Sequence, residues 1–176
     1  SGTITSGVVT APTASEVTIA SYNLERFFND INDPGITEPV LTTVAFNNRL
    51  GKASLGIRNN LRMPDIVGVI EVENLATLQS LATRISADAI AASQPDPLYV
   101  PYLVEGNDVG GIDVGFLVKT APVFGATPRV AVTEVVQELD GSLFTTSGGV
   151  NPTSTIQALA LYISDQIKQR IATLFD

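Results

Sequence analysis

The segment PDIVGVIEVEN, residues 64–74, joins a run of aliphatic residues to two carboxylates and an amide. The aliphatic residues predict a buried strand over 65–72, and Glu71 and Glu73 lie at its end. Burying an unpaired carboxylate is costly, so such a group needs a partner or an open edge of the sheet. A bound cation is one partner that would justify carboxylates at the end of this strand.

The composition limits which chemistry the chain can perform. Its 176 residues include no cysteine and no histidine. Disulfides, thiolate zinc sites, imidazole ligands and Ser-His-Asp or Cys-His catalysis are therefore excluded within this sequence. The formal net charge is −8, from 18 acidic and 10 basic residues, which disfavours direct binding to DNA or anionic membranes. A divalent cation could still bridge such a protein to a phosphate.

Hydrophobic periodicity predicts a layered fold behind these residues. Residues 1–15 are rich in Ser, Thr, Gly and Pro and are interpreted as a leading linker, and residues 16–176 are interpreted as one domain. No apolar stretch is long enough to span a bilayer. Asn74 is a candidate N-cap for the second helix. The pattern predicts helices at 42–62, 75–91 and 155–174, and strands at 16–24, 65–72, 97–105, 112–119 and 128–138.

The alternation of these elements predicts the sheet type. Helices between the early strands favour an α/β (α+β) domain, and the later strands, which lack helices between them, favour antiparallel pairing. We therefore expect a mixed sheet flanked by helices. On the first helix, four basic side chains are expected on the solvent side: Arg49, Lys52, Arg58 and Arg62.

Three segments resemble a known family when taken together. IASYNLERFF, PDIVGVIEVENLATLQ and EGNDVGGIDVGFLVK, in this order and spacing, resemble the endonuclease/exonuclease/phosphatase superfamily, in particular secreted bacterial nuclease-like members of its DNase I-like group. The likeness is clear over residues 16–138 and fades over 140–176. It implies a four-layer sandwich of two sheets with helices outside, here incomplete, and an extracellular or periplasmic location in a bacterium.

The resemblance also implies a reaction and a site. Members of this family hydrolyse phosphodiesters or phosphomonoesters with Mg²⁺ or a similar ion such as Mn²⁺ or Ca²⁺. Glu71 matches the family's metal-binding glutamate and Asn23 its first-strand asparagine, so both are expected to be catalytic and to lie at the metal. The family has Gln where this chain has Ile70. Since Mg²⁺ prefers hard oxygen ligands and often uses only one or two carboxylates, we expect Asn23 and Glu71 to converge within about 6 Å at the ends of adjacent strands.

Other polar residues are weaker candidates. Asn107 and Asp108 lie in a Gly-flanked loop and could contact substrate, although turn formation is the alternative. Asp113 begins the next strand and could also contact substrate, or could anchor the loop by a hydrogen bond. Strand alternation predicts that Glu73 shares a face with Glu71, where it would support the site or would be solvated or salt-bridged.

The C-terminal motifs of the family, including its catalytic histidines, are missing. We therefore expect the N-terminal part of a divalent-metal-dependent phosphodiesterase, inactive alone, whose intact form acts on nucleic acid or another phosphodiester. The missing portion, or self-association, would cover one face of the sheet. The chain could also join segments that are not adjacent in the parent. A non-catalytic binding or scaffold module, and a lipid or nucleotide phosphate hydrolase, are the alternatives.

Overall fold

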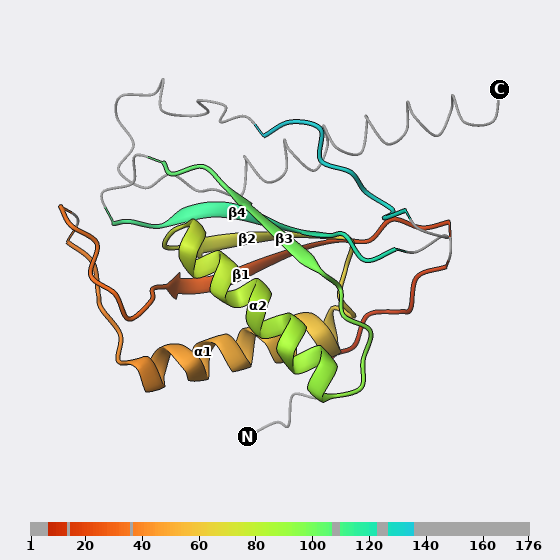
Figure 1. The fold of residues 1–176 in the computed structure, drawn as a ribbon, viewed down its shortest axis with the longest axis horizontal. Helices are drawn as coiled ribbons and strands as arrows, with labels where there is room; N and C mark the ends of the chain where they lie inside the picture. Colours follow the sequence, from red (N-terminus) through yellow and green to blue (C-terminus); the bar gives the residue numbers. More distant parts are fainter. Residues whose placement is uncertain (1–6, 14, 36, 107–109, 123–126, 136–176) are drawn as a thin grey trace. The chain divides into compact units, whose positions relative to one another are not determined.

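The computed structural model describes residues 7–13, 15–35, 37–106, 110–122 and 127–135. These form a mixed four-stranded sheet with two helices packed on one face (Figure 1). The order across the sheet is β1-β2-β4-β3, with β1 at Ile19–Phe27, β2 at Ile66–Val72, β3 at Tyr99–Leu103 and β4 at Asp113–Lys119. β1 pairs parallel with β2, and β4 pairs antiparallel with both β2 and β3. The mixed α/β sheet with antiparallel late strands is confirmed.

The two helices connect the strands. α1 spans Thr43–Leu55 and begins at Thr42, whose side chain accepts a hydrogen bond from the Ala45 amide. The predicted helix at 42–62 does not run unbroken, because it continues as a π-helical turn, η1, over Gly56–Asn60. α2 spans Leu75–Ala91, as predicted, and the Asn74 side chain caps it by accepting from the Thr77 amide at 2.8 Å.

The core lies between the helices and one face of the sheet. Val67 and Val69 of β2 and Leu117 of β4 are completely buried there. Apolar residues spaced three or four apart on each helix cover these strands, as helical periodicity requires. The buried helix residues are Phe46, Leu50, Ala53, Ile57, Leu78, Leu81, Ala82 and Ile85. This packing fixes β1 and β2 side by side, with their C-terminal ends at the same edge of the sheet.

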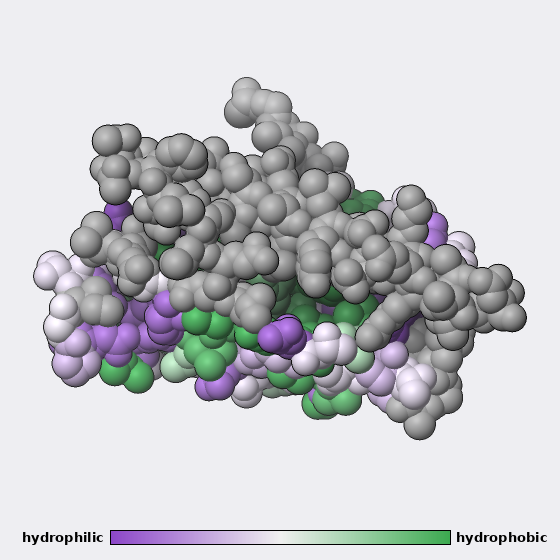
Figure 2. All heavy atoms as spheres, turned by 90° about the horizontal axis from the view of Figure 1, so that it is seen from above, coloured by the Kyte–Doolittle hydropathy of each residue, from purple (hydrophilic) through white to green (hydrophobic). Residues whose placement is uncertain are grey.

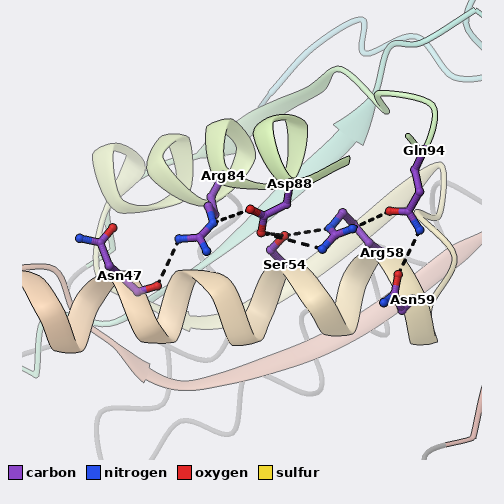
Figure 3. Close-up of polar contacts among 7 residues, drawn as sticks. All are labelled: Asn47, Ser54, Arg58, Asn59, Arg84, Asp88 and Gln94. Carbon is purple, nitrogen blue, oxygen red and sulfur yellow. Dashed lines mark hydrogen bonds and ion pairs between the residues drawn. The ribbon is translucent and has the colours of Figure 1, made fainter. Parts of the chain in front are cut away.

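A polar network joins α1 and η1 to α2 (Figure 3). The Asp88 carboxylate accepts hydrogen bonds from Ser54 at 2.7 Å and from Arg84 at 2.8 Å. Arg58 donates to Ser54 and to the Gln94 side chain. The predicted solvent exposure of Arg58 is wrong: the residue is 8% exposed, because its guanidinium extends along the helix surface to these partners.

Several predicted elements differ from the structure. Residues 128–135 are not a strand: Thr127 makes an isolated bridge, and no ladder follows it in the described part. Residues 16–18 precede β1, where the Thr18 amide and hydroxyl donate to Asp65. The helix predicted at 155–174 lies outside the described residues, and the second sheet of a four-layer sandwich is not among the described strands. No described helix is long and apolar enough to cross a membrane.

Candidate functional site at the ends of β1 and β2

Asn23 and Glu71 meet at the ends of two adjacent strands. Asn23 of β1 is in register with Ile70 of β2, the residue before Glu71. The Asn23 amide nitrogen donates to the Glu71 carboxylate at 2.9 Å. The predicted convergence of the two side chains is therefore confirmed.

A β-bulge aims the Glu71 side chain. The register shifts between Ile70 and Val72, and Glu71 has a φ of 62°. In an unbroken strand, Glu71 would point to the opposite face from Ile70 and from its partner Asn23. The bulge instead turns the carboxylate toward Asn23. A left-handed conformation at a non-glycine residue costs on the order of 1–3 kcal/mol and recurs at functional sites.

A second irregularity, in β1, supplies the other hydrogen-bond donor to the Glu71 carboxylate. The register of β1 shifts between Asn23 and Phe27, and Glu25 and Arg26 both have positive φ, at 58° and 52°. This turn directs the Arg26 amide to the other Glu71 oxygen at 2.9 Å. The Glu25 amide donates to the Asn23 side-chain oxygen at 2.7 Å.

Arg49 of α1 holds this turn from the helix side. Its guanidinium donates to the carbonyl of Leu24 at 2.9 Å and also to the carbonyl of Glu25. It also lies over the Phe27 ring, 5.4 Å from the centroid. The expectation that Arg49 is only a solvated surface residue is therefore wrong, whereas Lys52 is exposed as predicted.

The donor set at Glu71 fits one divalent cation with most of its shell supplied by water or substrate. Among the described residues, each Glu71 oxygen accepts one hydrogen bond. An ionised carboxylate has about four lone-pair sites, so capacity for a metal remains. Asn23 directs its amide nitrogen to Glu71 and its oxygen to the Glu25 amide. The geometry therefore suits Asn23 to positioning Glu71 rather than to ligating the metal itself.

A basic groove borders Asn23. It has a volume of about 530 Å³ and lies between the C-terminal half of β1 and α1. Three basic side chains, Arg26, Arg49 and Lys52, line it together with one acidic side chain, Glu25. In a chain of net charge −8, this is a local concentration of positive charge beside the candidate metal ligand.

Asp113 begins β4, opposite Val72 of β2. Its carboxylate accepts a hydrogen bond from the Gly106 amide at 2.8 Å, across the loop that precedes β4. The loop-anchoring interpretation of Asp113 is therefore confirmed. Asn107 and Asp108 lie outside the described residues.

Glu73 is neither solvated nor salt-bridged within the described part of the chain. It is 3% exposed, and its carboxylate accepts from the Asn29 amide at 2.7 Å and the Thr77 hydroxyl at 2.9 Å. Burial raises the pKa of Glu73 to about 7; the Asn29 and Thr77 hydrogen bonds oppose this rise, and the neighbouring Glu38 adds to it. Because of the bulge at Glu71, the expectation that the two glutamates share one face is wrong.

The sequence interpretation missed two acidic neighbours of Glu73. Asp33 and Glu38, from the loop between β1 and α1, bring carboxylate oxygens to within 4.8 Å of one another and of Glu73. Their segment contains Asn-Asp-Pro-Gly, which indicates a turn. In the sequence, the only indication of this cluster is two carboxylates in one loop. The fold then brings that loop to the end of β2.

None of the protein-family models matches this chain, and searches of curated proteins and of solved structures found no significant match. The assignment of a function therefore depends on the geometry at the ends of β1 and β2.

Proposed function

We propose that the chain provides the metal-binding part of a divalent-metal-dependent phosphodiester hydrolase, with Glu71 as the metal ligand. The observation that supports this best is the Glu71 bulge, which turns one carboxylate out of the strand pattern to the sheet edge. There it is held by Asn23 and by the Arg26 amide. Ligands of α/β sheets gather at the C-terminal ends of parallel strands, and β1 and β2 are such a pair.

The charge distribution supports an anionic substrate at this edge. A protein of net charge −8 repels phosphate at long range, so it needs a local source of positive charge. Arg26, Arg49 and Lys52 supply part of that charge in the groove beside Asn23. A divalent cation on Glu71 supplies the rest.

Each residue has a distinct role in this proposal. Glu71 would hold the ion, and Asn23 and the Arg26 amide keep its carboxylate in one orientation. Arg49 keeps the β1 turn in place through the Leu24 and Glu25 carbonyls. When bound, the ion would act as a Lewis acid on a phosphoryl oxygen. The substrate class is a phosphodiester, with nucleic acid as the first candidate.

Binding of a phosphorothioate oligonucleotide, which resists hydrolysis, tests this proposal. We expect its fluorescence anisotropy to rise with the chain in Mg²⁺ and to remain low in EDTA. Glu71→Gln keeps the size of the side chain but removes its charge, so it should weaken Mg²⁺-dependent binding by at least about 10-fold, the lower end of the range for support residues of metal sites.

Glu134→Gln is the control, because Glu134 is an exposed carboxylate in another segment and does not line the groove. It should bind the oligonucleotide as the wild type does. Equal binding in EDTA and in Mg²⁺, or an unchanged affinity in Glu71→Gln, would show that Glu71 does not recruit phosphate through a metal.

A further inference from the structure

A second group of carboxylates lies beyond the end of β2, apart from the Asn23–Glu71 pair. Asp33 and Glu38 come from the loop between β1 and α1, and Glu73 lies between β2 and the N-cap of α2. Each contributes a carboxylate oxygen, and these oxygens lie within 4.8 Å of one another. Segments about 40 residues apart in the sequence therefore meet at one acidic centre.

Hydrogen bonds hold each of these carboxylates in place. Glu38 accepts from the Asp33 amide at 2.6 Å, and Asp33 accepts from the Asn74 side chain at 2.8 Å. Glu73 accepts from Asn29 and Thr77 through one of its two oxygens. The three groups are thus positioned before any ligand arrives.

Two oxygens at this centre are buried and have no hydrogen-bond partner among the described residues: one oxygen of Glu73 and one of Glu38. Glu73 as a whole is 3% exposed. The ion pairs of the described residues involve Asp65 and Asp88 and not these three carboxylates. Buried acceptors without a partner are costly, and a bound cation or a shared proton would satisfy these two.

We propose that Asp33, Glu38 and Glu73 bind a divalent cation, with Ca²⁺ as the best match. Ca²⁺ takes oxygen ligands at 2.3–2.6 Å, so oxygens on opposite sides of one ion lie about 5 Å apart. An upper separation of 4.8 Å fits within that limit. Ca²⁺ also accepts irregular shells of six to eight oxygens, whereas Mg²⁺ demands near-ideal octahedral geometry at about 2.1 Å.

The proposed ion would join the loop that follows β1 to the junction of β2 and α2. It would therefore stabilise the contact between this loop and the β2–α2 junction. It would not bind at the Asn23–Glu71 pair. The inference does not depend on the proposed hydrolase function, because it rests on different residues and predicts a change in stability.

Thermal unfolding of the full 176-residue chain, first freed of metal with EDTA, tests the proposal. We expect added Ca²⁺ to raise the melting temperature, with a Kd of about 10⁻⁴ M, as for weak Ca²⁺ modules. At 100 times the Kd, the folding equilibrium constant should rise about 100-fold. The same response is expected in Glu71→Gln, which separates this centre from the β1–β2 edge.

Glu38→Gln is the decisive variant, since Glu38 lies in an irregular loop and is only half-buried. It should weaken Ca²⁺ binding, measured by calorimetry, by at least about 10-fold. The control is Glu134→Gln, an exposed carboxylate in another segment, which should respond as the wild type does. Absence of a Ca²⁺ effect on the wild type would overturn the proposal, as would an undiminished effect in Glu38→Gln. Stabilisation by Glu38→Gln without any Ca²⁺ response would assign the centre to a shared proton instead.

Discussion

At the level of single residues, two backbone irregularities, one in β1 and one in β2, bring the Asn23 and Glu71 side chains into contact. Each residue closes an apolar strand, and parallel strands bring their C-terminal ends to one edge. The bulges carry no such signature, because Glu25, Arg26 and Glu71 have no preference for positive φ. The acidic centre at Glu73 was equally hidden, since it depends on a loop position that only tertiary structure supplies.

Asn23→Ala should weaken metal binding at Glu71 while leaving the fold intact. The substitution removes the 2.9 Å hydrogen bond that orients the carboxylate. Loss of such an orienting partner typically costs about 10–100-fold in metal affinity. Because Asn23 is exposed, the loss of stability should be about 1 kcal/mol or less. Calorimetric titration with Mn²⁺ and urea unfolding measure the two effects.

Ser21→Ala is the matched control for Asn23→Ala, since Ser21 is exposed two residues earlier on the same face of β1. It should leave Mn²⁺ affinity unchanged. If Asn23→Ala has wild-type affinity, Asn23 does not position Glu71.

At the level of elements, periodicity located most of the helices and strands correctly. α2 and its Asn74 cap follow directly from an apolar stripe and an N-cap residue. The strand predicted at 128–138 fails over its described residues, because alternating valines favour extended backbone but a strand also needs a partner. Helical periodicity also fails for Arg58. It placed this residue away from the core, but the long side chain reaches buried partners.

Asp88→Asn should loosen the packing of α1 against α2. Asp88 joins Ser54, Arg58 and Arg84 (Figure 3), and the substitution leaves the buried Arg58 without its carboxylate. Hydrogen bonds to charged groups contribute about 1.5–3 kcal/mol, so we expect a loss of about 2 kcal/mol at pH 7, measured by urea unfolding. Glu134→Gln, an exposed carboxylate outside the network, should change stability little.

The stability that Asp88 contributes should depend on pH. Burial alone would raise the pKa of Asp88, but the hydrogen bonds of Ser54 and Arg84 and the charges of Arg84 and Arg58 outweigh it and lower the pKa below its ordinary value. A lowered pKa means that the contribution is complete above the unfolded value and is lost as pH falls through the folded value. The difference in unfolding free energy between wild type and Asp88→Asn should therefore be constant from pH 5 to 7 and should shrink below about pH 4. A difference that grows on acidification would contradict this assignment.

At the level of the whole molecule, the described chain is one mixed sheet covered by helices on one face. By strand register, the other face carries Asn23 together with apolar residues such as Ile66, Ile70 and Val118. Figure 2 shows hydrophobic residues in the middle of the visible described surface, interspersed with hydrophilic ones. Composition and periodicity were sufficient for this α/β character, but a second sheet could be inferred only from resemblance.

The chain by itself should hydrolyse phosphodiesters at no more than trace rates. It has no histidine, and general acid–base assistance, which histidine most often provides, is typically worth about 10²–10⁴-fold. Incubation of the purified chain with supercoiled plasmid in Mg²⁺ should therefore leave the plasmid largely intact. Rapid Mg²⁺-dependent cleavage that Glu71→Gln abolishes would show that the 176 residues contain a complete catalytic set.

Paramagnetic broadening by Mn²⁺ in NMR spectra tests most directly whether Glu71 binds a divalent cation. At low Mn²⁺, and with Glu38→Gln present in every protein to weaken the nearby acidic centre, we predict that signals of the Asn23 side-chain amide and the Arg26 backbone amide broaden when Glu71 is intact and in Glu134→Gln, and broaden much less in Glu71→Gln. Remaining broadening of the Asn29 amide, which donates to Glu73, reports on any Mn²⁺ that the acidic centre still binds. Equal broadening of Asn23 and Arg26 in Glu71→Gln, or no broadening of these signals when Glu71 is intact, would contradict a metal site at Glu71.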